Sequence, residues 1–122
     1  MILVDTSVWV DHLRARDKAL SGLLDAGMVL AHPFVIGELA LGNLRQRGIV
    51  LSALLNLPHA SVATEAEVLH FIDRYALFGG GIGYVDTHLL AAARLTAGAE
   101  LWTNDERLHG VAVQLGLAVT LP

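Results

Sequence analysis

Short β-prone runs alternate with longer helical stretches along almost the whole chain, and this alternation restricts the fold more than any other feature. Strands that alternate with helices of this length form a mostly parallel sheet with helices packed on its faces. We therefore expect an α/β fold in which a central, mostly parallel sheet is flanked by helices. The predicted strands are residues 2–4, 28–31, 61–63, 101–103 and 118–121.

Start and stop signals place helices between these strands. Thr6 and Ser7 are good helix caps, and Pro33 suits the first turn of a helix. Thr64 followed by Glu67 is a capping-box pattern, and a glycine cluster at 79–83 indicates a loop. The first predicted helix begins after residue 5, and the others cover 19–26, 34–44, a segment between 48 and 58, 64–75, 86–97 and 107–115.

The apolar content favours a single domain with an apolar surface patch that is buried against another protein chain. Of the 122 residues, 54% are hydrophobic and 16% are charged, so we expect one core and one domain over residues 1–122. Such a surplus is often buried against another subunit, which favours a dimer or a complex. No apolar run approaches the roughly 20 residues that span a bilayer, and no basic segment precedes the first strand, so we expect a cytoplasmic protein without a membrane segment.

The cysteine content and the net charge limit which metal sites and which nucleic-acid interactions are possible. With no cysteine, disulfides and thiolate zinc sites are excluded, so any metal must be held by oxygen or imidazole. The formal net charge of -4 argues weakly against nucleic-acid binding, because such proteins usually neutralise phosphates. Bound cations would change the local charge, and seven arginines could line a groove.

Three acids lie where a parallel sheet places its ligands. Asp5 directly follows one predicted strand and Asp105 lies just after another, and the carboxyl ends of parallel strands meet at one edge of the sheet. Asp86 begins a predicted helix after the glycine loop, where free backbone N–H groups favour negative charge. Each of the three is equally explained as an ordinary helix cap.

Glu38 is the only charged residue in the stretch 34–44, whose other residues are mainly apolar. A helix that is apolar on nearly all sides is buried, and a buried carboxylate needs a partner or a metal. We therefore expect Glu38 to be buried at the site. The alternative is that Glu38 lies on a narrow exposed edge or pairs with an arginine.

Clustered carboxylates repel one another unless a hard divalent cation such as Mg²⁺ or Mn²⁺ holds them, and the chain has a single lysine, Lys18, to neutralise them. Such metals serve metal-assisted hydrolysis of phosphate esters. Four polar residues beside the acids could bind metal-bound water or phosphate, but they could equally be turn and cap residues. They are Thr6, Ser7, Thr103 and Asn104.

Other motifs add little. The six histidines show no HExxH spacing, and His88, two residues after Asp86, is the one nearest to a candidate acid. The glycine loop matches neither a P-loop nor a dinucleotide fingerprint. Trp9 and Trp102 are expected to pack in the core.

Four motifs in order make the chain resemble a PIN domain, and most closely a VapC toxin. They are MILVDTSVWVDHL at the start, the helix of Glu38, GYVDTHLLAAARL around Asp86 and LWTNDERL around Asp105. The resemblance covers nearly the whole length. It matches Asp5, Glu38, Asp86 and Asp105 with the family's four acids, and it adds Thr6 and Thr103 as secondary site residues.

The resemblance implies a ribonuclease that binds Mg²⁺ or Mn²⁺ at the four acids and cleaves structured RNA. It also implies a small antitoxin partner, whose C-terminal segment fills the groove, and a homodimer. A housekeeping PIN nuclease is the alternative within the same family.

Other classes fit the residues less well. A receiver domain shares the size and the acidic Mg²⁺ pocket, but it has paired acids after the first strand and a late lysine. A haloacid-dehalogenase-like phosphatase has a DxD motif, and Ser7 stands where its second Asp should be. A catalytically silent binding module would be expected to lose one of the acids, and none is missing.

Overall fold

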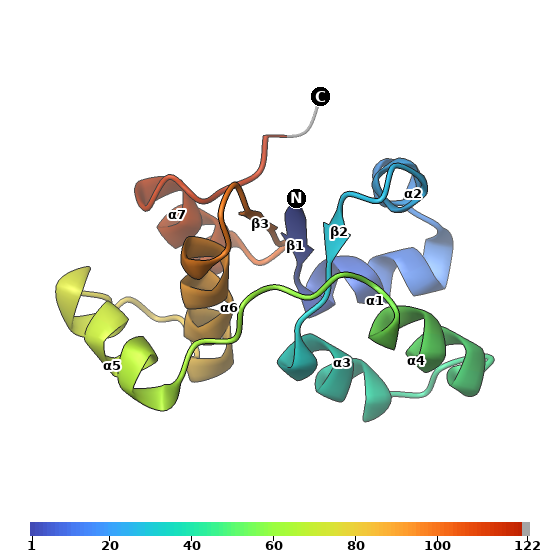
Figure 1. Cartoon of the computed structure of the whole chain (residues 1–122), viewed down its shortest axis with the longest axis horizontal. Coiled ribbons are helices and arrows are strands. Elements are labelled where there is room, and N and C mark those ends of the chain that lie inside the picture. The colour runs from blue at the N-terminus through green and yellow to red at the C-terminus, as the bar shows by residue number, and fades with distance from the viewer. Residues whose placement is uncertain (121–122) are drawn as a thin grey trace.

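The computed structural model describes residues 1–120, and its strands form a small parallel sheet at the centre of the molecule (Figure 1). β1 (Ile2–Val4) lies between β2 (Val29–Leu30) and β3 (Glu100–Trp102). Both pairings are parallel, and the register pairs Leu3 with a leucine on each side. The expected α/β fold with a central parallel sheet flanked by helices is confirmed.

Helices surround the sheet on both sides. Figure 1 shows α1 to α4 gathered on one side of the strands and α5 to α7 on the other. In the described part of the chain, none of these helices is long and apolar enough to cross a membrane. Their bounds are α1 (Thr6–Ala15), α2 (Lys18–Asp25), α3 (Pro33–Ala40), α4 (Arg47–Leu55), α5 (Glu65–Arg74), α6 (Tyr84–Leu95) and α7 (Glu106–Gln114).

The hydrophobic core contains buried residues from every strand and helix, and α6 contributes the largest share. Every residue of α6 from Thr87 to Ala93 is buried, and Leu89 and Leu90 are fully covered. Burial of a leucine of this kind stabilises the fold by about 1.5–3 kcal/mol relative to an exposed one. Trp9 and Trp102 are also buried, as expected. This packing fixes the carboxyl ends of β1 and β3 beside the first turn of α6.

The expected strand at 61–63 is wrong, because pairing at that edge of the sheet stops earlier. Ala31 forms an isolated parallel bridge with His59, and the Ala60 N–H donates to the Ala31 carbonyl at 2.9 Å. The next amide, that of Ser61, donates instead to the Thr96 hydroxyl at 2.9 Å. The chain therefore leaves the sheet and turns toward α5.

The expected strand at 118–121 is also wrong over the described residues. The segment forms only one isolated bridge, between Leu101 and Ala118, and residue 121 of that prediction lies outside the described residues.

The capping box of α5 is confirmed. The Glu67 N–H donates to Thr64 Oγ1 at 3.1 Å, and the Thr64 N–H donates to Glu67 Oε1 at 2.9 Å.

Candidate active site

Asp5 directly follows β1 and is the most buried of the four predicted acids, with 6% of its surface exposed. Its N–H donates to the Trp102 carbonyl at 2.9 Å, which ties it to the end of β3. Its Oδ2 accepts hydrogen bonds from Ser7 Oγ and Thr103 Oγ1, each at 2.7 Å. A buried carboxylate with two donors is held in one orientation, so Asp5 is the fixed point of the site.

Thr103 connects Asp5 to Asp105. While its hydroxyl donates to Asp5, its oxygen accepts from the Asp105 N–H at 3.0 Å. Asp105 is the N-cap of α7, and its Oδ1 accepts from the Leu108 N–H at 2.9 Å. The cap fixes the direction of an otherwise exposed carboxylate. The two acids that follow strands are therefore joined through one buried hydroxyl.

Ser7 has a role that sequence reasoning left undecided. Its hydroxyl donates to Asp5 and accepts from the Asn104 N–H at 3.0 Å, so it links the start of α1 to the segment after β3. Asn104 in turn donates from its side chain to Asp11 at 2.8 Å. The available signal was the position of Ser7 two residues after Asp5, where a hydroxyl can reach the carboxylate.

Glu38 is exposed, and the expectation that it is buried is wrong. Helix α3 buries Val35 and Leu39, but Phe34 in its first turn is 37% exposed, and Leu41, directly after its end, is 90% exposed. An apolar surrounding sequence was therefore not a sign of burial. Thr6 Oγ1 donates to Glu38 Oε1 at 2.8 Å, which directs this carboxylate toward the start of α1.

The pKa of Asp86 is raised by its surroundings, which include the other three acids. It lies in the first turn of α6 and is half-buried, and a Cβ on Gly83 would lie 3.9 Å from its Oδ2. Burial is the main cause that raises the pKa of Asp86, followed by the charge of Asp5. Asp105 and Glu38 raise this pKa further, while the backbone of Gly83 lowers it. The negative charges of the other three acids therefore reach Asp86, and the four residues are hereafter called the four-acid site.

Two of the six histidines, His88 and His32, are buried in the packed interior. His88 is buried, and the rings of Phe34 and Tyr84 lie edge-on to it, with centroids 4.8 and 4.7 Å away. His32 is buried and accepts from the Phe34 N–H at 3.0 Å. His88, despite its closeness to Asp86 in sequence, is thus placed as a packing residue.

The donor set of the four-acid site fits a hydrated hard cation. Among residues 1–120, no three His, Cys, Asp or Glu side chains stand close enough to hold one ion directly. Mg²⁺ usually keeps several waters and binds proteins through one or two carboxylates, so direct contact with three is not required. Burial and three neighbouring negative charges raise the pKa of Asp86, and a bound cation would favour its charged form against both effects.

Comparison with known proteins identifies the family. The family model described as PIN domain matches residues 2–114. The chain is also similar to Ribonuclease VapC32 of Mycobacterium tuberculosis, in strains CDC 1551 / Oshkosh and ATCC 25618 / H37Rv. With each it shares 49% identity over 119 residues, which cover 98% of this chain and 96% of the relative. These matches confirm the resemblance and exclude the receiver and phosphatase alternatives: the chain belongs to the PIN-domain family.

Proposed function

We propose that this chain is a metal-dependent endoribonuclease that hydrolyses RNA phosphodiester bonds at the four-acid site. The observation that carries the proposal is the half-buried Asp86, on which the other three carboxylates all act. Such a cluster opposes folding in the free protein, and perturbed groups of this kind concentrate at functional sites. The similarity to Ribonuclease VapC32 over nearly the full length supports RNA as the substrate.

Mg²⁺ or Mn²⁺ is the cofactor that suits these ligands, because carboxylate oxygens favour hard cations. Asp5 and Asp86, the two least exposed acids, would hold the ion, and Asp105 and Glu38 would hold its waters. When bound, the cation supplies an acidic water and stabilises the charge that develops on the phosphate.

The chain's own residues orient the acids and accept protons. Ser7 and Thr103 keep Asp5 in place, and Thr6 does the same for Glu38. A carboxylate that is held in this way can accept a proton from an attacking water, and we propose that water, and not the RNA 2′-hydroxyl, is the nucleophile. An RNA with a single deoxyribose at the cleaved position should therefore still be cut.

RNA cleavage by the purified protein tests the proposal. We expect cleavage with Mg²⁺ or Mn²⁺, loss of cleavage in EDTA, and a fall of about 10²-fold or more in the variant Asp86→Asn. Glu65→Gln removes an exposed acid from the first turn of another helix and should cleave like wild type. Undiminished cleavage in EDTA, or by Asp86→Asn, would contradict the proposal.

We also propose that the chain is the toxin of a toxin–antitoxin pair and forms a homodimer. The likeness to Ribonuclease VapC32 supports the pairing, and large exposed apolar side chains such as Leu41, Ile49 and Phe78 support a covered surface. Light scattering should give a dimer, and expression from the native operon should yield a co-purifying small protein. A strict monomer with no such protein indicates a housekeeping PIN nuclease instead.

A further inference from the structure

An arginine side chain lies against the glycine loop that precedes α6. Gly81 has a φ of +78°, a left-handed conformation that glycine adopts without strain. A Cβ on Gly81 would lie 2.8 Å from Arg107 Nη1 and 3.4 Å from its Cδ and Cζ. The Arg107 side chain therefore occupies the space that any larger residue at position 81 would fill.

This contact places Arg107 between the segments that carry two of the four acids. Gly83, two residues after Gly81, is the N-cap of α6 and lies next to the Asp86 carboxylate. Arg107 itself is in the first turn of α7, two residues after Asp105. The side chain thus bridges the segment that carries Asp105 and the loop that leads to Asp86.

The positive charge of Arg107 has no partner in the described part of the chain. Within residues 1–120 its guanidinium forms no hydrogen bond or ion pair, and no cation is among the groups that shift the pKa of Asp86. The first turn of a helix also disfavours positive charge. Four of the seven arginines, by contrast, hydrogen-bond or stack within the chain, namely Arg16, Arg47, Arg74 and Arg94.

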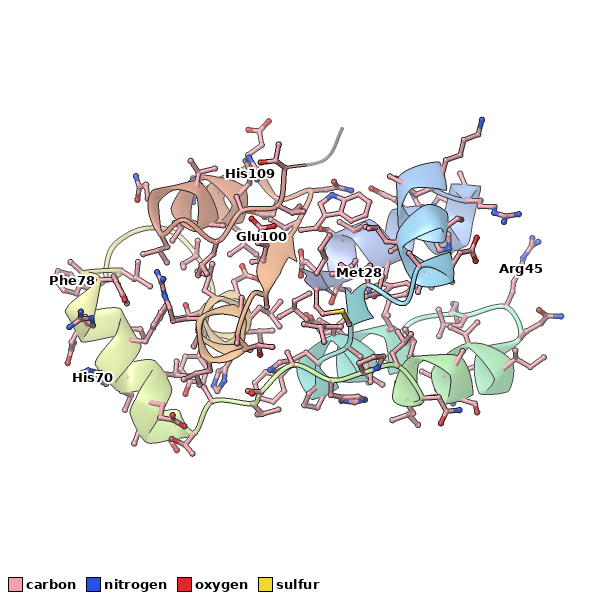
Figure 2. All side chains as sticks on the ribbon, turned by 45° about the horizontal axis from the view of Figure 1, so that its top comes forward. Met28, Arg45, His70, Phe78, Glu100 and His109 are labelled. Atoms are coloured by element: carbon pink, nitrogen blue, oxygen red, sulfur yellow. The ribbon has the colours of Figure 1, made fainter. Side chains whose placement is uncertain are left out.

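The remaining two arginines lie elsewhere. Arg14 and Arg45 line a hollow of about 500 Å³ beside α1 and the segment that follows α3. Figure 2 shows Arg45 at one end of the molecule, far from His109 of α7. Arg107 is therefore the arginine whose position relates directly to the four-acid site.

Building on the proposed ribonuclease function, we propose that Arg107 binds a backbone phosphate of the RNA beside the scissile bond, with Gly81 keeping the guanidinium in place. A guanidinium can bind phosphate through two parallel hydrogen bonds, and phosphate contacts fix the register of a nucleic acid on a protein. In a chain of net charge -4, such a contact also offsets the repulsion between RNA and the acids.

RNA binding measured without cleavage tests this role. Fluorescence anisotropy would follow a labelled, mixed-sequence single-stranded RNA on the Asp86→Asn protein with Mg²⁺, over a range of KCl concentrations. Adding Arg107→Gln should weaken binding about tenfold. It should also reduce the slope of log affinity against log salt by about 0.7. Arg107→Lys should retain the slope and lose part of the affinity, because lysine keeps the charge without the paired donors.

Arg74→Gln is the matched control, because it removes the same charge from an exposed position on α5. Affinity and salt slope equal in Arg107→Gln and Arg74→Gln would overturn the proposal. A lower melting temperature of Arg107→Gln in EDTA, together with an unchanged salt slope of RNA binding, would also overturn it. The arginine would then stabilise the fold by offsetting the charge of the acids, and it would not bind RNA. Both results leave the ribonuclease function intact if wild type cleaves RNA, whereas absence of cleavage refutes that function by itself.

Discussion

Replacing Asp86 by asparagine removes one carboxylate from the four-acid site and keeps the shape of the side chain. Asp86 is the best position for this test, because its pKa is raised by burial and by Asp5, Asp105 and Glu38. Asp5 is less suitable, since two hydroxyls donate to it and its replacement would disturb them. The variant should therefore be more stable than wild type when no metal is present.

The expected gain is small and can be bounded. A like charge near a half-buried carboxylate costs on the order of 1 kcal/mol. A negative charge in the first turn of α6 also stabilises the helix, so its loss destabilises the variant by at least a few tenths of a kcal/mol and offsets part of the gain. The remainder should raise the melting temperature in EDTA by roughly 2–5 °C for a domain of this size.

The sign of the pH dependence follows from the raised pKa. The ionised form of Asp86 opposes folding, so wild type is at a disadvantage only where that group is charged. The gain of Asp86→Asn should be present at neutral pH. It should vanish as the pH falls through the raised pKa to below the ordinary value of 3.8, because both side chains are then neutral.

With divalent metal, wild type should become more stable than Asp86→Asn, which reverses the order expected in EDTA. A ligand that binds only the native state stabilises it by about 2.7 kcal/mol at a hundredfold excess over its dissociation constant. Wild type should gain more than Asp86→Asn in Mg²⁺ or Mn²⁺, as measured by thermal melting. The control Glu65→Gln should gain as much as wild type. If Asp86→Asn melts well below wild type in EDTA and both respond equally to metal, Asp86 only caps α6 and the nuclease account loses its physical support.

Two further variants test how the site is held. Thr103→Val keeps the side-chain shape but removes the hydroxyl that serves Asp5 and the Asp105 N–H, so urea denaturation should show a loss of about 1–3 kcal/mol; an unchanged stability would contradict the role of this hydroxyl. His32 has 0% exposure and a pKa lowered to about 4, first by burial and then by two neighbouring histidines, so protonation favours unfolding. Wild type should lose about 2 kcal/mol between pH 7 and pH 5 from this group. His32→Asn can still cap α3 and should flatten that part of the pH profile; an unaltered profile would assign the loss to other groups.

The sequence was sufficient to predict the features that depend on neighbouring residues and on the order of strands and helices. Asp5 and Asp105 follow strands, and parallel strands bring their carboxyl ends together wherever they lie in the chain. Helix signals such as the Thr64–Glu67 capping box depend on residues that are near one another in sequence.

Features that depend on tertiary packing could not be predicted in this way. The hydroxyl of Thr103 reaches Asp5 only because β3 lies beside β1, and no local pattern encodes that contact. The apolar sequence around Glu38 suggested burial, but α3 buries Val35 and Leu39 and leaves the Glu38 carboxylate exposed. Residues 61–63 have a strand-like sequence but no partner strand beyond Ala31.

Anomalous X-ray diffraction from crystals grown with Mn²⁺ tests the central claim most directly, because it locates the ion without reference to activity. We predict a manganese peak beside the carboxylates of Asp5 and Asp86, with Asp105 and Glu38 around its waters, and no peak there in crystals of Asp86→Asn. Manganese bound only at other places in wild-type crystals, or at the same place in both proteins, would contradict the claim that these four acids form the metal site.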